Sequence, residues 1–301
     1  MDSRERYIAT VNHEKVDRFF RRNWVGWPAT TKRWIKEGLP ENWHQINFFN
    51  SDEEATTGIN LGWVNSPFDP PFEEKVLKED STTRLIQDAN GGIRKEFVTD
   101  QVQYSMPQWI KRPVENRKDW EKIKRRLRPD SKRRLANLRL CIDFWTSLKK
   151  ASRGGRRDYP LHQNIIGAFM HMRNLFGVEK LFVTMFKDPD LIDDIMQNWL
   201  DLNKYIMGKV LEVIDVDTVA FGEDISYKHG CMISPKMYRR FLSPYYKELT
   251  AFVKSYRDVK IIYDTDGNLD QVIPLIIEWG CEALQPVEIA ADNDPVAIRK
   301  Q

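Results

Sequence analysis

The chain has 301 residues, of which 41% are hydrophobic and 12% aromatic, so it can bury a sizeable core and is neither disordered nor a small disulfide scaffold. Its 47 Lys and Arg residues nearly balance 44 Asp and Glu residues, and the formal charge of +3 argues against a protein dedicated to nucleic acid. Three widely spaced cysteines form no CxxC motif, and no stretch approaches the ~20 apolar residues of a membrane span. We therefore expect a cytoplasmic protein.

The first half of the chain predicts a β-hairpin followed mainly by helices. Residues 82–86 and 93–98 flank Asn90-Gly91-Gly92, a pattern typical of a β-hairpin. Two helices are predicted between residues 120 and 150, and the basic character of this region indicates a solvated helix surface. A strand is predicted over 161–166, a helix over 178–186, and a longer helix over 188–213.

The second half alternates strands and helices. Strands are predicted over 216–221, 259–263 and 282–287, helices over 235–255 and 269–279, and a last helix from Asp294-Pro295. Such units form parallel strands covered by helices, and neither GxGxxG nor GxxxxGK[ST] is present to indicate an open-sheet nucleotide site. We predict a (β/α)8 barrel of the TIM type.

The predicted barrel is incomplete. Only about six strand candidates are found where a closed barrel needs eight. We expect residues 1–301 to form a single domain that lacks the last βα units at its C-terminus and carries the hairpin near 82–98 as decoration.

Acidic residues follow three successive predicted strands. They are Glu223, Asp224, Asp264, Asp266 and Glu288. In a barrel, the C-terminal ends of the strands and the loops after them converge on one face, here called the mouth, where barrel enzymes place their sites. Carboxylates confined together raise one another's pKa, which makes a general acid or base, or they share a cation. Each acid taken alone is also compatible with a helix cap, whereas the group indicates chemistry.

Two segments resemble the uroporphyrinogen decarboxylase superfamily. They are residues 221–246, FGEDISYKHGCMISPKMYRRFLSPYY, and the Asp266-Gly267-Asn268 motif followed by residues 284–291, LQPVEIAA. Weaker similarity extends to Asp17-Arg18, residues 27–40 and Asp188-Pro189. The resemblance implies a (β/α)8 barrel. It places the chain in an uncharacterised branch nearer to the corrinoid-dependent methyltransferases, and family members extend beyond the point where this sequence ends.

The sequence departs from both characterised chemistries of that superfamily. The Arg-Gln-Ala-Gly-Arg loop of the decarboxylases is absent, and residues 21–27 are RRNWVGW. The methyltransferases bind zinc through a His-x-Cys motif at the positions of Asp264 and Asp266. Two carboxylates at these positions imply a harder divalent cation, or zinc in an oxygen-rich site.

The resemblance and the acids together favour metal-assisted methyl transfer from a small methylated substrate to a corrinoid carrier. We expect Asp264 and Asp266 to be metal ligands, and Glu223, Asp224 and Glu288 to be catalytic. The expected substrate-binding residues are Arg21, Arg22, His162, Tyr263 and Asn268. We expect a corrinoid protein as a partner, and we expect no binding to nucleic acid or membranes. Whether the chain forms a homodimer is left open.

Two alternatives remain at this point. The first is decarboxylation of uroporphyrinogen or a similar polycarboxylate, which needs no metal or other cofactor and uses arginines to hold the carboxylates. The second is an inactive shortened barrel.

Overall fold

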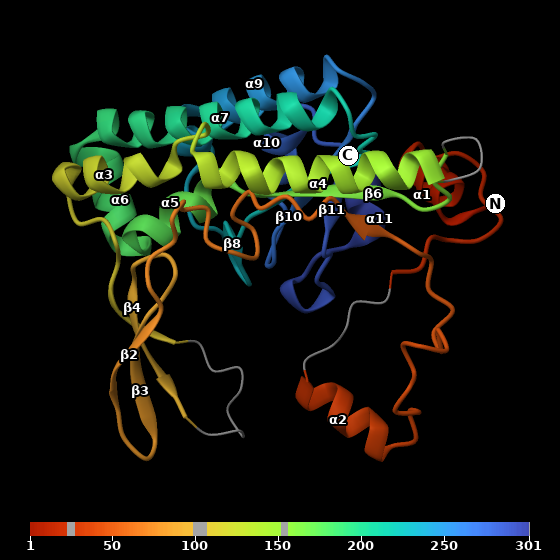
Figure 1. The fold of residues 1–301 in the computed structure, drawn as a ribbon, viewed down its shortest axis with the longest axis horizontal. Coiled ribbons are helices and arrows are strands. Elements are labelled where there is room, and N and C mark those ends of the chain that lie inside the picture. Colours follow the sequence, from red (N-terminus) through yellow and green to blue (C-terminus); the bar gives the residue numbers. More distant parts are fainter. Residues whose placement is uncertain (23–27, 99–106, 152–155, 301) are drawn as a thin grey trace.

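The computed structural model describes residues 1–22, 28–98, 107–151 and 156–300. Its helices are α1 (Ser3–Val11), α2 (Pro28–Lys36), α3 (Arg117–Lys124), α4 (Lys132–Ala151), α5 (Ala168–Phe176), α6 (Val178–Lys187), α7 (Pro189–Leu211), α8 (Pro235–Phe241), α9 (Ser243–Lys254), α10 (Ile273–Ile277) and α11 (Pro295–Arg299) (Figure 1). Its strands are β1 (Ala55–Thr56), β2 (Lys75–Glu79), β3 (Thr83–Gln87), β4 (Ile93–Phe97), β5 (Gln108–Lys111), β6 (Leu161–Ile166), β7 (Thr218–Gly222), β8 (Ser226–Tyr227), β9 (Gly230–Cys231), β10 (Lys260–Asp264) and β11 (Ala283–Gln285).

A five-stranded sheet in the order β1-β6-β7-β10-β11 forms the centre of the fold. All of its neighbouring strands pair in parallel, and the register aligns Ile166 with Gly222, Gly222 with Asp264, and Asp264 with Gln285. The C-terminal ends of four strands therefore lie at one edge. The α/β class and the parallel strands agree with the predicted barrel type, and the strands of the described residues do not close into a barrel.

Long helices cover the outer side of this sheet, with α7 packed against α9 (Figure 1). Their apolar faces and the outward side chains of the strands form one continuous core, which includes Trp199, Phe221, Tyr246 and Tyr263. Burial of this apolar surface provides the main stabilisation of the parallel strands, which are hydrophobic along their length. Among the described residues, no helix is long and apolar enough to cross a membrane.

Helix α1 covers the inner side of the sheet at the N-terminal ends of the strands. The hydroxyl group of Tyr7 lies 2.8 Å from that of Thr218, the first residue of β7. Tyr7 also shares a small core cluster with Ala220 and Ile262. This packing leaves the opposite end of the sheet, the mouth, for polar residues.

The predicted hairpin is present and belongs to a larger sheet. Strands β3 and β4 pair antiparallel around the turn at residues 88–92, and β2 and β5, which the sequence pattern did not indicate, complete the order β2-β3-β4-β5. In Figure 1 this sheet projects from the body in the same direction as α2 and β8.

Two predicted helices differ from the structure. The helix expected over 235–255 is divided into α8 and α9, because Pro244 cannot donate a backbone hydrogen bond within a continuous helix and instead occupies the first turn of α9. The helix expected over 269–279 is reduced to α10, which has Pro274 in its first turn.

Candidate functional site

Four of the five predicted acids lie close enough to influence one another at the mouth. Asp264 ends β10, and both Asp266 and Asp224 act electrostatically on its carboxyl group. Glu288 and Asp224 act in the same way on Asp266. The predicted convergence of strand ends thus brings Asp224, Asp264, Asp266 and Glu288 into one negatively charged region.

The surroundings of Asp264 favour the protonated form of its carboxyl group. Burial raises its pKa to about 6, and the negative charges of Asp266 and Asp224 act in the same direction. A hydrogen bond of 2.7 Å from Gln285 Nε2 to Asp264 Oδ2 opposes the shift without cancelling it. Because general acids work best with a pKa near the working pH, this carboxyl group is suited to donate a proton near neutral pH.

Gln285 connects Asp264 to a segment from the beginning of the chain. The guanidinium group of Arg22 donates to Gln285 Oε1 at 2.7 Å and to Glu54 Oε2 at 2.6 and 2.8 Å. Burial alone would raise the pKa of Glu54, but its contacts with His162 and Arg22 hold it below the ordinary value. Arg22 therefore lies beside Asp264, with its charge balanced by Glu54, and its role in substrate binding stays a prediction.

Sequence reasoning missed Gln285 and Glu54. Gln285 is a polar residue at the end of a strand, which is a weak signal that it lies at the mouth. Glu54 precedes β1, a strand of only two residues, and no pattern in the sequence indicates it.

Glu223 is buried beside the mouth and has a structural partner for each oxygen. Its carboxyl group accepts hydrogen bonds from the backbone N–H groups of Phe169 and Met170, with donor–acceptor distances of 2.9 and 2.7 Å. It also accepts a hydrogen bond from the Tyr246 hydroxyl group. Since Gly167 provides no side-chain cap for α5, Glu223 caps that helix. A Cβ atom at position 167 would lie 2.2 Å from Glu223 Cδ, so only glycine allows this close approach.

Burial raises the pKa of Glu223 to about 7, against the ordinary value of 4.5. The folded protein therefore binds more protons than the unfolded chain between these two values, and its free energy of unfolding falls as the pH rises through that window. The Glu223→Gln variant should lose this contribution, about 3 kcal/mol across the window. Urea unfolding at pH 5 and pH 7.5 measures it, with exposed Glu121→Gln as the matched control. An unchanged pH dependence in Glu223→Gln would contradict the assignment.

The other carboxylates have partners of their own. Asp224 forms an ion pair with Arg173 at 2.6 Å, and Glu288 Oε2 accepts the Gly267 N–H at 2.6 Å. Within residues 1–22, 28–98, 107–151 and 156–300, no three His, Cys, Asp or Glu side chains form a group that could hold a metal ion. The role of Asp264 and Asp266 as metal ligands stays a prediction, for which the described chain supplies no third ligand. A cation bound there would keep the Asp264 carboxyl group ionised, so this role and that of a proton donor exclude each other.

The other three predicted substrate-binding residues have partners within the protein. His162 is opposite Thr218 at the N-terminal end of β7 and packs edge-on against Tyr7, and its Nε2 lies 3.2 Å from Glu54 Oε2. It therefore lies below the mouth and contacts the carboxylate that pairs with Arg22. Tyr263 is fully buried on the outer side of the sheet, because alternate residues of β10 face opposite sides, and it contacts Tyr246 and Trp279. Asn268 donates to the carbonyl oxygen of Ala291 and thus holds two mouth loops together.

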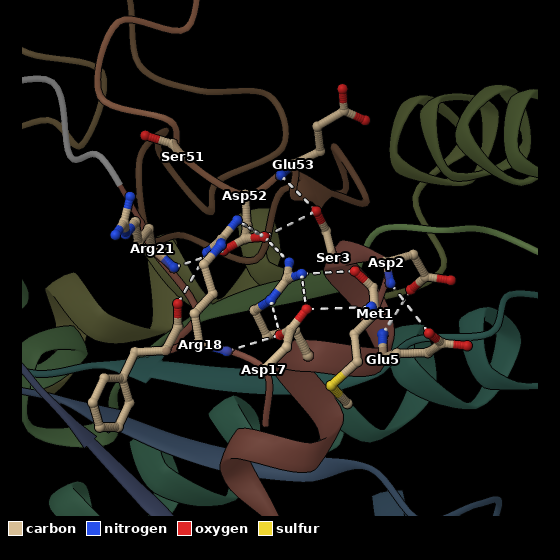
Figure 2. A network of polar contacts seen from close by, with 12 residues as sticks. Met1, Asp2, Ser3, Glu5, Asp17, Arg18, Arg21, Ser51, Asp52 and Glu53 are labelled. Atoms are coloured by element: carbon tan, nitrogen blue, oxygen red, sulfur yellow. Dashed lines mark hydrogen bonds and ion pairs between the residues drawn. The ribbon is translucent and has the colours of Figure 1, made fainter. Parts of the chain in front are cut away.

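A buried ionic network holds the segment that contains Arg22. Asp52 has 1% of its side chain exposed and forms ion pairs with Arg6 and with Arg18 (Figure 2). The Arg21 backbone N–H also donates to Asp52, at 2.8 Å. Among the described residues, the Arg21 side chain has no hydrogen-bond partner. This network joins residues 17–22 to residues 51–54, so Arg22 and Glu54 reach the site from a common anchor. Residues 23–27 lie outside the described chain.

Comparisons with known proteins agree on the architecture. The model of the uroporphyrinogen decarboxylase (URO-D) family matches residues 97–294, about two thirds of the chain. A solved methyltransferase from Methanosarcina mazei is 14% identical, with a TM-score of 0.55, and the alignment covers 94% of this chain and 75% of that one. Likeness at this level of identity shows a common fold. No curated protein matches the sequence.

Proposed function

Because the chain belongs to the uroporphyrinogen decarboxylase family, we propose that it is an enzyme that transfers a methyl group from a small methylated substrate to a corrinoid carrier, with Asp264 as the proton donor. The observation that carries the proposal is the position of Asp264, a half-buried carboxyl group at the end of a parallel strand that Gln285 holds at 2.7 Å. Its burial, which raises the pKa to about 6, agrees with this role. The likeness in fold to a methyltransferase supports the same class of reaction.

The proposed step breaks the bond between the methyl carbon and a heteroatom of the substrate. The corrinoid, as the second substrate, supplies the electron pair that forms the new bond to the methyl carbon. The electron pair of the broken bond stays on the heteroatom, and Asp264 donates its proton there, which leaves a carboxylate. Gln285 fixes the orientation of the acid through its 2.7 Å hydrogen bond. A carboxylic acid that protonates a leaving atom is worth about 10²–10⁴ in rate.

The charge of the mouth favours a small neutral or cationic substrate. Arg22 is paired with Glu54, and Arg173 is paired with Asp224, so both cations are already balanced by carboxylates. A substrate with several carboxylates would also meet the negative charges of Asp224 and Glu288. The inner side of the sheet below Asp264 is apolar, with Trp63 packed against the cluster of Tyr7, Ala220 and Ile262.

Decarboxylation of a polycarboxylate is the second candidate, since the family model itself is that of a decarboxylase. The same acid would then protonate the carbon that loses CO2. The two reactions share Asp264 and differ in the charge of the substrate they require.

A panel of substrates separates the candidates. The purified protein is incubated with reduced cobalamin and, in turn, methanol, methylamines, dimethyl sulfide and a methoxylated aromatic, and methylcobalamin is followed by absorbance. CO2 release from uroporphyrinogen is measured on the same preparation, together with its metal content. Formation of methylcobalamin with any donor supports methyl transfer. CO2 release without methylcobalamin would favour the decarboxylase, and a folded protein that does neither would favour the inactive barrel.

A further inference from the structure

The projecting sheet of β2, β3, β4 and β5 has one face that carries positive charge only. Residues opposite each other in an antiparallel pair lie on the same face. The register aligns Lys78 with Leu85, Leu85 with Lys95, and Lys95 with Gln108. A second row of the same face aligns Lys75, Gln87, Ile93 and Lys111, and Phe97 lies opposite Thr83. We call this surface the lysine face and define it by Lys75, Lys78, Leu85, Ile93, Lys95, Phe97 and Lys111.

The lysines of this face are largely without partners. In the part of the chain that the structure describes, Lys78, Lys95 and Lys111 form no ion pair, and Lys75 reaches only Glu73, at 3.4 Å. Phe97 is 53% exposed. The other face differs, because its Arg84 and Arg94 both bond to Glu96. The free positive charge of the sheet is therefore concentrated on the lysine face, around the exposed Phe97 and the half-buried Leu85 and Ile93.

The base of the sheet lies next to the mouth. Directly after β5, the guanidinium group of Arg112 stacks 3.6 Å from the centre of the Trp109 ring. Burial lowers the pKa of Arg112 to about 10, and the positive charge of Arg173 acts in the same direction. Arg173 bonds to Asp224 of the mouth, so the sheet joins the body beside the candidate site. A protein bound to the sheet would lie within reach of the mouth.

We propose that the lysine face docks an acidic protein, which presents the methyl acceptor to the mouth. This inference rests on the proposed methyl transfer, since only that reaction needs a carrier protein. Unpaired lysines around Leu85, Ile93 and Phe97 fit a partner whose carboxylates surround an apolar patch. Single-stranded RNA fits less well, because the face has one aromatic side chain and no arginine for base stacking.

The test compares binding with turnover in the full-length chain. The Lys78→Glu/Lys95→Glu variant reverses two charges of the face. Lys236→Glu/Lys247→Glu makes the same change at exposed positions of α8 and α9. Binding of each protein to an immobilised corrinoid protein of net negative charge is measured by interferometry at 0.05 and 0.5 M salt. Turnover with free reduced cobalamin is measured in parallel, and circular dichroism verifies folding.

We expect the Lys78→Glu/Lys95→Glu variant to bind the carrier at least about 10-fold more weakly at low salt, with a smaller difference at high salt. Its turnover with free cobalamin should equal that of the parent, and the Lys236→Glu/Lys247→Glu control should bind normally. Equal carrier binding by both double variants would overturn the proposal. The proposal would also be overturned if the parent bound a 20-nucleotide RNA more tightly than the carrier and the Lys78→Glu/Lys95→Glu substitutions abolished that RNA binding. Loss of carrier binding in a protein that never turns over cobalamin would support docking and reject the proposed methyl transfer.

Discussion

Replacement of Asp264 by Asn is expected to lower kcat for methyl transfer about 100-fold, with a smaller change in KM, because the amide keeps the shape of the side chain and cannot donate the proton to the leaving atom. The hydrogen bond from Gln285 can persist in this variant, since the new amide retains a carbonyl oxygen that accepts it. Steady-state kinetics with the best donor of the panel measures the effect.

The matched control for this prediction is Asp270→Asn, at an exposed aspartate of the same loop region. It should keep the parental kcat, because Asp270 is exposed and is not one of the acids that act on Asp264. A kcat of Asp264→Asn within twofold of the parent would reject Asp264 as the proton donor. Loss of activity in both variants would indicate damage to the loops rather than to the acid.

Replacement of Asp52 by Asn is expected to lower the free energy of unfolding by about 3 kcal/mol, because it removes the buried carboxylate that pairs with both Arg6 and Arg18 and leaves Arg6 only the half-exposed Asp17. Burial alone would raise the pKa of Asp52, but Arg18, the Arg21 N–H and Arg6 hold it below the ordinary value. The ionised carboxylate therefore stabilises the fold above pH 4, and this contribution is lost as the pH falls through the lowered pKa. Urea unfolding at pH 7 measures the change.

The Asp52→Asn variant should also lose activity, because residues 17–22 and 51–54 share this anchor and carry Arg22 and Glu54. Glu53→Gln is the control, since Glu53 is an exposed neighbour whose backbone N–H, and not its carboxylate, bonds to Ser3. A loss of less than about 1 kcal/mol for Asp52→Asn would mean that the network contributes no more than a surface ion pair.

Much of the central sheet could be predicted from sequence. Strand β6 has the predicted bounds, and β7 and β10 each differ by one or two residues, because short β-branched segments between helix caps are strong local signals. Those same strands place Asp224, Asp264 and Asp266 at one end, so the acidic part of the site follows from the order of elements. Pro244 indicates a break in the helix predicted over 235–255. The apolar residues continue with helical spacing on both sides of the proline, so the periodicity alone predicts one uninterrupted helix.

The rest of the site depends on contacts between distant segments. Arg22 and Gln285 are 263 residues apart, and no local pattern indicates that their side chains meet. Glu223 looks like its neighbour Asp224 in the sequence, yet one carboxyl group caps a buried helix and the other faces Arg173. The contact of His162 with Glu54 is of the same kind, since it joins β6 to a residue 108 positions earlier in the chain.

The pH dependence of kcat/KM for methyl transfer tests the central claim most directly, because it reports the acid of the free enzyme. With a pKa of about 6 for Asp264, kcat/KM should be constant below pH 5.5 and fall tenfold for each pH unit above 6.5. This fall of kcat/KM above pH 6.5 should be absent from the residual activity of the Asp264→Asn variant. A kcat/KM that rises through pH 6, or that is independent of pH in the parent, would contradict a role for Asp264 as the proton donor.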